Sequence, residues 1–294
     1  MLTAILLCMA TTLAALGCLK RFAPHLGLLE HPRGHRTHEL PTPVVGGVGM
    51  AAGLFVTWLA PNPVEPSAAV TVGALGLVLI GVHDDRRVLR ARAKFLAQFC
   101  VVTAAAAFGG DLLRTSGKLL RGIELRLAML ALPFTVFAVL GLINAVNMLD
   151  GLDGLAGTIA LVAFGWLAAC MWMVEGTNRL GGNLAIFGAI SVFLLFNARL
   201  PGRPRALMFM GDTGSMLLGY LLAIAAIAAA TGLAGVTGWR QGVPDWIMFA
   251  SLIVIGLAYH QGCRIAWRDL RAREAAVAVA GAGRRSARRR GSPS

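Results

Sequence analysis

The chain has 294 residues, of which 57% are hydrophobic and 14% are charged, and its formal net charge is +13. Ordinary soluble domains carry about 25% charged residues, so this composition excludes an ordinary soluble domain. The apolar residues fall in blocks of about 20, the length at which a helix spans a bilayer, and this also excludes collagen-like, disordered and coiled-coil chains.

These blocks predict an all-α fold, a polytopic bundle of about nine transmembrane helices. The expected spans lie near residues 2–19, 44–60, 67–82, 94–109, 127–146, 155–174, 180–197, 214–233 and 245–262. We expect residues 1–262 to form the membrane domain, and residues 263–294 to form a basic, disordered cytoplasmic tail.

The first span is predicted to be an uncleaved helix with its N-terminus outside, because Lys20 and Arg21 follow it directly. The segments then expected in the cytoplasm are 20–43, 83–93, 147–154, 198–213 and 263–294, and they hold most of the 27 Lys and Arg residues. This agrees with the positive-inside rule. The exception is segment 110–126, and the alternation in Leu119–Leu127 predicts a short periplasmic hairpin there.

The excess of basic residues is expected to set the membrane topology and to contact anionic lipid head groups rather than a nucleic acid.

Acidic residues are scarce, yet five of the eight aspartates lie in three short cytoplasmic stretches: Asp84 and Asp85, Asp150 and Asp153, and Asp212. A carboxylate beside hydrocarbon is unfavourable unless it meets a cation or a polar cavity. The clustering therefore predicts a functional site at this membrane face.

The first acidic stretch is GVHDDRR at residues 81–87, where Asp84 and Asp85 stand at a helix end with arginines after them. Adjacent carboxylates suit a divalent metal, or control of proton and charge at an incoming phosphate. A solvated helix end balanced by arginine is the alternative interpretation.

The second stretch places Asn144, Asn147, Asp150 and Asp153 at three-residue spacing. On a helix this spacing would put all four on one face, where their oxygens suit Mg²⁺, a nucleobase or a sugar. Glycines between them would let a ligand approach the backbone. A helix cap followed by an Asp turn is the alternative.

The third stretch, FMGDTGS at residues 209–215, precedes an apolar span, so Asp212 should lie at the start of a helix. Exposed N–H groups there favour phosphate, and Asp212 could hold a metal against it. A simple N-cap is the alternative.

The first cytoplasmic loop combines prolines and glycines with arginines and the histidines His31, His35 and His38. Such a rigid basic loop suits a diphosphate, whereas zinc lacks a further ligand set nearby. Taken together, these stretches predict a Mg²⁺-dependent site for a phosphorylated cytoplasmic substrate that meets a lipid.

Four segments carry a resemblance to a known family: HELPTPVVGG at 38–47, GVHDDRR at 81–87, NAVNMLDGLDGLAG at 144–157 and FMGDTGS at 209–215. In them the chain resembles the polyprenyl-phosphate N-acetylhexosamine-1-phosphate transferases, glycosyltransferase family 4. The resemblance implies transfer of a sugar 1-phosphate from a UDP-sugar to undecaprenyl phosphate, with release of UMP. The GlcNAc-type members are the most similar, so UDP-GlcNAc is the expected donor, for a first step of cell-wall or lipopolysaccharide-type polysaccharide biosynthesis.

The resemblance also implies a bacterial inner-membrane location, a cytoplasmic site, a requirement for Mg²⁺ (with Mn²⁺ as an alternative) and a homodimer. It assigns Asp212 as the principal metal ligand, with Asn147 and Asp150 beside it at the metal and nucleotide. It assigns Asp84 and Asp85 to the lipid phosphate, as a base or an orienting group. The expected catalytic residues are Asp84, Asp85, Asp150 and Asp153, and the expected substrate-binding residues are His38, Lys94, Asn144, Asn197 and Phe209. Lys94 would supply counter-charge to phosphate, and Asn197 and Phe209 would contact uridine.

One departure from the family's sequence pattern leads to an alternative prediction. The family carries a His-x-His-His type loop between its last spans, whereas after Asp245 this chain has the single histidine His260. This predicts, as the alternative, a catalytically silent member that acts as a scaffold. A transporter is a third class, but transporters place acids near the midplane and often show inverted repeats, whereas these acids lie at one face.

Overall fold

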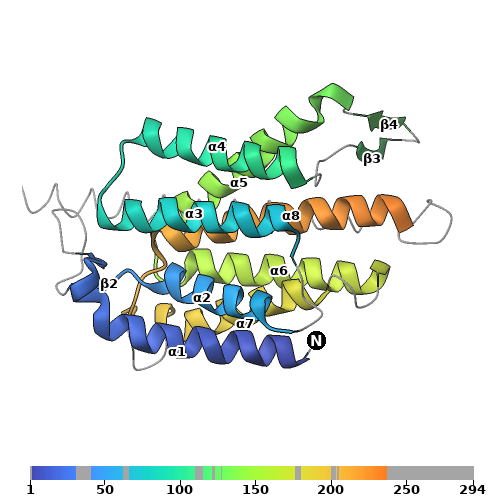
Figure 1. Ribbon diagram of the computed structural model, residues 1–294. Coiled ribbons are helices and arrows are strands. Elements are labelled where there is room, and N and C mark those ends of the chain that lie inside the picture. The colour runs from blue at the N-terminus through green and yellow to red at the C-terminus, as the bar shows by residue number, and fades with distance from the viewer. Residues whose placement is uncertain are drawn as a thin grey trace, which may run out of the picture.

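The computed structural model describes residues 2–30, 41–61, 66–109, 115–120, 123–126, 128–175, 180–199, 203 and 205–236. Over these residues the protein is a bundle of α-helices with two small sheets (Figure 1). The helices are α1 Leu2–Leu26, α2 Gly46–Leu59, α3 Ala68–Arg86, α4 Ala91–Gly109, α5 Ala131–Leu149, α6 Leu155–Glu175, α7 Leu180–Asn197 and α8 Gly211–Val236, with a 3₁₀ turn Ala128–Leu130 before α5.

Each of the two sheets is an antiparallel pair of strands. Strand β1 (Leu29–Glu30) pairs with β2 (Thr42–Pro43), and β3 (Thr115–Leu120) pairs with β4 (Ile123–Arg126). The β3–β4 hairpin lies within segment 110–126, and β4 falls in the alternating stretch Leu119–Leu127 that predicted a hairpin, whereas most of β3 precedes that stretch. It stands at the same end of the bundle as the N-terminus, while β2 lies at the opposite end (Figure 1).

The helices fit a multi-pass membrane protein. Within the described residues, six are long and apolar enough to cross a membrane: Leu2–Leu26, Ala68–Arg86, Ala91–Phe108, Ala131–Leu149, Leu180–Asn197 and Gly211–Ala228. Helix α2 has 14 residues and is therefore about 21 Å long, less than the ~30 Å hydrocarbon core. The predicted span at 245–262 and the tail at 263–294 lie outside the described residues.

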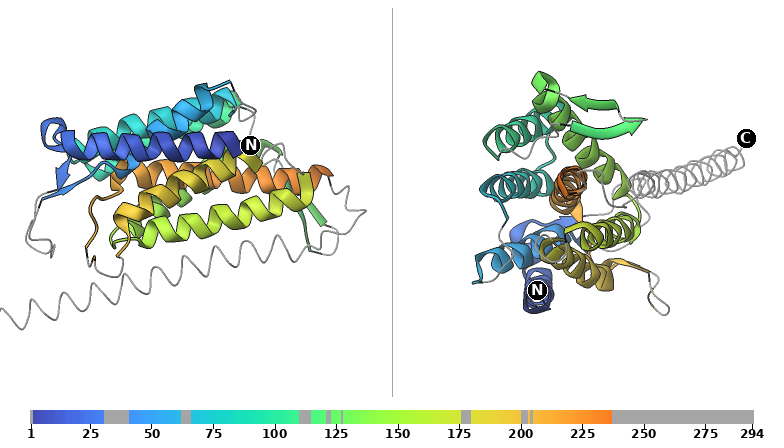
Figure 2. Two further views of the ribbon diagram at one scale, coloured as in Figure 1. Left: turned by 90° about the horizontal axis from the view of Figure 1, so that it is seen from below. Right: turned by 90° about the vertical axis from the view of Figure 1, so that its right-hand side faces the viewer.

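Helix α8 forms the centre of the bundle, and the end-on view shows it surrounded by the other helices (Figure 2). It packs against α2, α3, α5 and α6. Glycines let these backbones touch: a Cβ on Gly47 would lie 2.1 Å from the Gly214 nitrogen, and one on Gly81 would lie 2.4 Å from Thr213 Cα. Close helix contacts through small residues are typical of membrane bundles.

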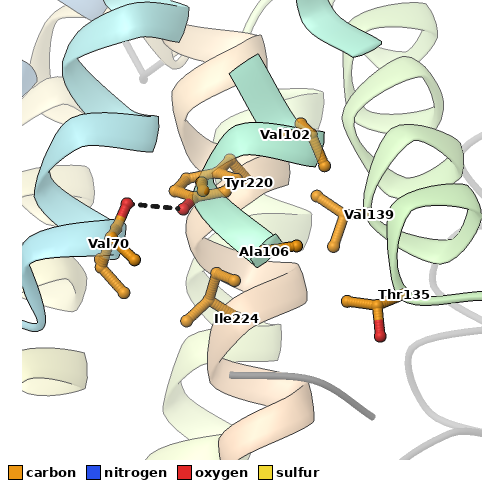
Figure 3. A pocket seen from close by; sticks show the side chains of 9 residues that line it. Val70, Val102, Ala106, Thr135, Val139, Tyr220 and Ile224 are labelled. Atoms are coloured by element: carbon orange, nitrogen blue, oxygen red, sulfur yellow. Dashed lines mark hydrogen bonds between the residues drawn. The ribbon is translucent and has the colours of Figure 1, made fainter. Parts of the chain in front are cut away.

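A small apolar pocket lies between α3, α4, α5 and α8 (Figure 3). Its lining includes Val102 and Ala106 of α4, Val139 of α5 and Tyr220 of α8. The Tyr220 hydroxyl donates a hydrogen bond to the Ala69 carbonyl at 3.3 Å, so its one polar group is satisfied at the pocket wall.

The end of α5 corrects one sequence-based prediction. The helix ends at Leu149, Asp150 is its C-cap residue, and the chain then turns through Gly154, whose φ is +79°. Only glycine adopts this φ without strain. Asp153 therefore lies in the turn, and the four polar residues predicted to share one helix face do not do so.

Candidate active site

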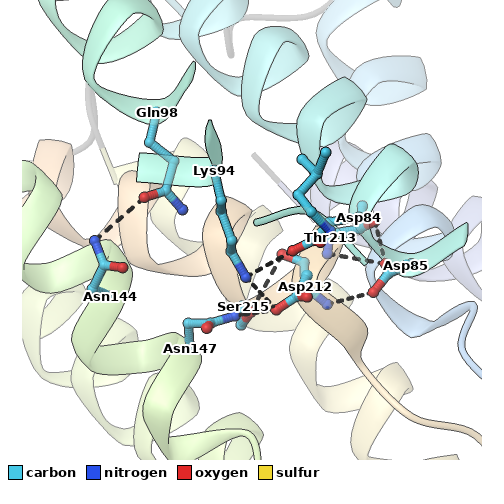
Figure 4. A network of polar contacts seen from close by, with 10 residues as sticks. Asp84, Asp85, Lys94, Gln98, Asn144, Asn147, Asp212, Thr213 and Ser215 are labelled. Atoms are coloured by element: carbon cyan, nitrogen blue, oxygen red, sulfur yellow. Dashed lines mark hydrogen bonds and ion pairs between the residues drawn. The ribbon is translucent and has the colours of Figure 1, made fainter. Parts of the chain in front are cut away.

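Four helix ends meet at one end of the bundle and bring together polar side chains that are far apart in the sequence (Figure 4). Asp84 and Asp85 come from the last turn of α3, and Lys94 comes from the first turn of α4. Asn147 stands near the end of α5, and Asp212 stands at the start of α8. We call these five residues the carboxylate cluster.

Lys94 links two of the carboxylates. Its ammonium nitrogen Nζ lies 2.9 Å from Asp84 Oδ2 and 2.8 Å from Asp212 Oδ1. The Asp84 side chain is only 4% exposed, and it also accepts the Leu89 N–H at 2.7 Å. A buried carboxylate requires such partners, so Lys94 and the Leu89 amide account for the burial of Asp84.

Asp212 is the more accessible carboxylate of this pair, with 32% of its side chain exposed. The Asn147 amide nitrogen donates to Asp212 Oδ1, the same oxygen that Lys94 contacts, and also to the Ser215 hydroxyl at 2.8 Å. The contacts of Lys94 and Asn147 with Oδ1 hold the Asp212 carboxylate in one orientation, and part of this carboxylate is exposed to solvent.

Asp85 is bound to the N-terminus of α8. Its carboxylate accepts the N–H of Asp212 at 2.7 Å, and the N–H and hydroxyl of Thr213 at 3.1 and 2.6 Å. An acid at this position is favoured by the helix dipole and by the free N–H groups of the first turn. The prediction that these N–H groups stay open for phosphate is therefore wrong for Asp212 and Thr213.

Asp150 is held beside this cluster. Desolvation of its carboxyl group, followed by the negative charges of Asp212 and Asp85, raises the pKa of Asp150 well above its usual range, although a hydrogen bond from the Gly211 backbone opposes this. Four carboxyl groups thus lie at this site beside the single Lys94 ammonium, and when they are ionised they favour a further cation.

The cluster fits a hard divalent cation by its chemistry, since carboxylate oxygens are the ligands that Mg²⁺ prefers. Asp84 and Asp212 already share one cation, the ammonium of Lys94. No group of three or more His, Cys, Asp or Glu side chains in the described part of the chain is arranged around a common metal position. Asp212, with its partly exposed carboxylate, is the residue that offers a metal the most direct access.

Asn144 lies one turn before Asn147 and makes a separate contact. Its amide nitrogen donates to the Leu140 carbonyl at 2.8 Å and to Oε1 of Gln98 at 3.3 Å. Sequence reasoning missed Gln98, and it also missed the contacts of Thr213 and Ser215. The available signal for Gln98 was a polar residue four positions after Lys94, inside an otherwise apolar span.

Three other predicted site residues make structural contacts outside the cluster: Asn197, Asp153 and Phe209. The buried Asn197 accepts the Gly154 N–H at 2.8 Å and donates to the Met208 carbonyl at 2.9 Å. Asp153 binds Nε of Arg199 at 3.0 Å.

The main chain of Phe209 donates to the Pro43 carbonyl at 2.8 Å and accepts the Gly46 N–H at 2.9 Å. The segment before α8 is therefore fastened to the chain that enters α2. His38 lies outside the described residues.

Comparisons with known proteins identify the family to which the chain is similar. Residues 67–230 match Glycosyl transferase family 4. The chain is 29% identical over 223 residues to the probable undecaprenyl-phosphate N-acetylglucosaminyl 1-phosphate transferase of Bacillus subtilis (strain 168), over 75% of this chain and 61% of that protein. It is 32% identical over 202 residues to the undecaprenyl-phosphate alpha-N-acetylglucosaminyl 1-phosphate transferase of Escherichia coli (strain K12), over 68% of this chain and 55% of that protein. The chain thus spans little more than half the length of these relatives.

Proposed function

The chain belongs to glycosyl transferase family 4, and from this membership we propose that it transfers a sugar 1-phosphate from a UDP-sugar to a polyprenyl phosphate. The proposed donor is UDP-GlcNAc and the proposed acceptor is undecaprenyl phosphate, the lipid in the names of its relatives. The observation that carries the proposal is the cluster in which Lys94 joins Asp84 to Asp212 at the ends of three apolar helices.

The proposed reaction is a phosphoryl transfer between two anions. An oxygen of the lipid phosphate attacks the β-phosphorus of the UDP-sugar, the bond between that phosphorus and the bridging oxygen breaks, and UMP leaves with the bond's electrons. The acceptor phosphate is already an anion and a competent nucleophile, so the proposed reaction needs no covalent enzyme intermediate. Catalysis then consists mainly of positioning and charge stabilisation.

The residues of the cluster divide these tasks. Lys94 supplies positive charge where both substrates are negative, and Asp84 holds its ammonium group in place. Asp85 fixes the first turn of α8 and with it Asp212. Asp150, held uncharged over a wider pH range than usual, limits the repulsion between this site and a phosphate.

We further propose that the reaction depends on Mg²⁺, held by Asp212 with Asn147 beside it. When bound, the ion would neutralise the diphosphate of the donor. The excess of carboxylates over the single Lys94 ammonium in the cluster supports this assignment. Mn²⁺, which also takes oxygen ligands, is the alternative ion.

The remaining parts of the proposal follow the family. We place the protein in a bacterial inner membrane with the cluster on the cytoplasmic side, the N-terminus and the β3–β4 hairpin outside, and a homodimer as the assembly. The basic segments at the cluster end of the bundle support this orientation by the positive-inside rule. The product would enter a cell-envelope polysaccharide pathway.

The test is UMP release by purified protein in detergent with undecaprenyl phosphate and Mg²⁺. UDP-GlcNAc, UDP-MurNAc-pentapeptide and other UDP-sugars are supplied in parallel, and Asp212→Asn serves as the inactive control. Release with UDP-GlcNAc supports the proposal, and release with another sugar corrects the donor. Silence with every donor, in a sample that melts cooperatively, would favour the catalytically silent scaffold instead.

A further inference from the structure

Gln98 is a buried amide whose hydrogen bonding is incomplete. It is fully buried in the middle of α4, and its Oε1 accepts the Asn144 amide at 3.3 Å. Its Nε2 has no hydrogen-bond partner among the described residues. A buried donor without a partner is unfavourable, most of all in a helix surrounded by hydrocarbon, so it points to a ligand at this position.

The position of Gln98 relates it directly to the carboxylate cluster. It follows Lys94 by one helical turn, so the two side chains project from the same side of α4. Figure 4 shows Asn144 and Asn147 facing them from α5, with the Gln98 oxygen directed to Asn144 and its nitrogen on the Lys94 side. The Asn144 contact thereby fixes the amide with its donor group turned toward the cluster.

Gln98 also lies deeper in the membrane than the cluster. Helix α4 begins at Ala91, at the end of the bundle where the cluster lies, and four residues advance it by about 6 Å. Beyond Gln98 the same two helices line the apolar pocket through Val102 and Val139. The amide therefore stands between the charged site and hydrocarbon.

We infer that Gln98 donates a hydrogen bond to a phosphate oxygen of the lipid acceptor and does not bind the UDP-sugar donor. This inference rests on the proposed function. A nucleotide-sugar is water-soluble and reaches the cluster from the aqueous end. A polyprenyl phosphate keeps its chain in hydrocarbon, so its phosphate at the cluster is the group that faces the deeper side, where Gln98 lies. A neutral amide donates to that phosphate without placing a charge in the membrane, while Lys94 supplies the charge at the aqueous end.

The variant that tests this inference is Gln98→Met, which keeps the length of the side chain and removes both N–H donors. Gln98→Leu provides a second apolar replacement in case the first fails to fold. Thr103→Val is the matched control, because Thr103 is on the same helix and its buried hydroxyl likewise has no hydrogen-bond partner in the described structure. Wild type and all variants are first compared by thermal unfolding in detergent.

The first readout is steady-state kinetics with each substrate varied in turn. We expect Gln98→Met to raise the KM for undecaprenyl phosphate by about tenfold or more, the range for a hydrogen bond to a charged group. The KM for the UDP-sugar should stay near the wild-type value, and Thr103→Val should change neither. A rise in the donor KM alone, or no change in either, would overturn the inference.

The second readout does not depend on turnover. Binding of undecaprenyl phosphate and of undecaprenol is compared by native mass spectrometry of the detergent-solubilised protein. Wild type should prefer the phosphorylated lipid, and Gln98→Met should lose most of that preference; an unchanged preference, or none in wild type, overturns the inference. If wild type prefers the phosphorylated lipid, Gln98→Met loses this preference and yet no sugar phosphate is transferred by wild type, the proposed function fails while this inference stands.

Discussion

Asp85 and Asp212 are 127 positions apart in the sequence, yet the Asp85 carboxylate accepts the Asp212 backbone N–H at 2.7 Å. With the two further bonds from Thr213, this contact ties the C-terminal end of α3 to the N-terminal end of α8. The arrangement makes Asp85 a residue that positions Asp212. It also separates the roles of two adjacent aspartates that the sequence presents as a pair.

Asp85→Asn should therefore lower stability and activity together. An amide can accept through one oxygen only and offers no negative charge to the helix, so we expect a loss of about 1–3 kcal/mol in the free energy of unfolding. Thermal unfolding in detergent measures this loss, and UMP release measures the activity. If the variant lost turnover at an unchanged unfolding temperature, Asp85 would act in the chemistry itself.

Asp212→Asn should abolish Mg²⁺-dependent transfer and leave the protein folded. The carboxylate is partly exposed, and an amide can keep the contacts with Asn147 and Lys94 only in part, so the main effect is loss of charge at the proposed metal position. We expect turnover to fall by at least about a hundredfold, the loss typical of a removed transition-state contact. Turnover near that of wild type would contradict the metal assignment.

Lys94→Met should make the fold more dependent on divalent cations. Without the ammonium, the Asp84 and Asp212 carboxylates repel each other in a partly buried site. We expect a lower unfolding temperature without Mg²⁺, and a larger increase on adding Mg²⁺ than in wild type. Arg92→Met, which removes an exposed cation from the same helix turn, is the control. An equal Mg²⁺ response in Lys94→Met and wild type would argue against a shared cation position.

Asp150 should make stability depend on pH in the metal-free protein. Because its pKa is raised in the folded state, the folded protein binds this proton more tightly than the unfolded chain does. The resulting stabilisation is complete below the unfolded pKa of about 4 and is lost as pH rises through the folded pKa. Asp150→Asn removes this dependence. Its unfolding temperature should exceed that of wild type at about pH 8 and approach it at about pH 4.

The sequence predicted the helices well because long apolar runs bounded by charge leave few alternatives. Each of the eight spans predicted before residue 237 overlaps a helix. It also predicted that Asp84, Asn147 and Asp212 belong to one site, since a polar group at the membrane face is favourable only beside other polar groups. Lys94 was added to that site by the family resemblance, and it contacts Asp84 and Asp212.

The partners of the individual side chains could not be predicted in this way. The motif GVHDDRR does not predict that Asp85 accepts the backbone N–H of Asp212, because that contact forms only when α3 and α8 pack together. The sequence also carried no sign that the Asn197 amide joins two loops through its contacts with Gly154 and Met208. Gln98 was overlooked because a single glutamine inside an apolar run carries no motif.

The glycine contacts at the start of α8 have a mechanical consequence. At Gly47 and Gly214, and at Gly81 and Thr213, main chain presses on main chain with no side chain between them to yield. Helices joined in this way cannot slide or roll past one another in small steps. Asp85 and Asp212 thus sit on a stiff frame, and the distance between the ends of α3 and α8 is set by main-chain contact rather than by side chains that could adjust.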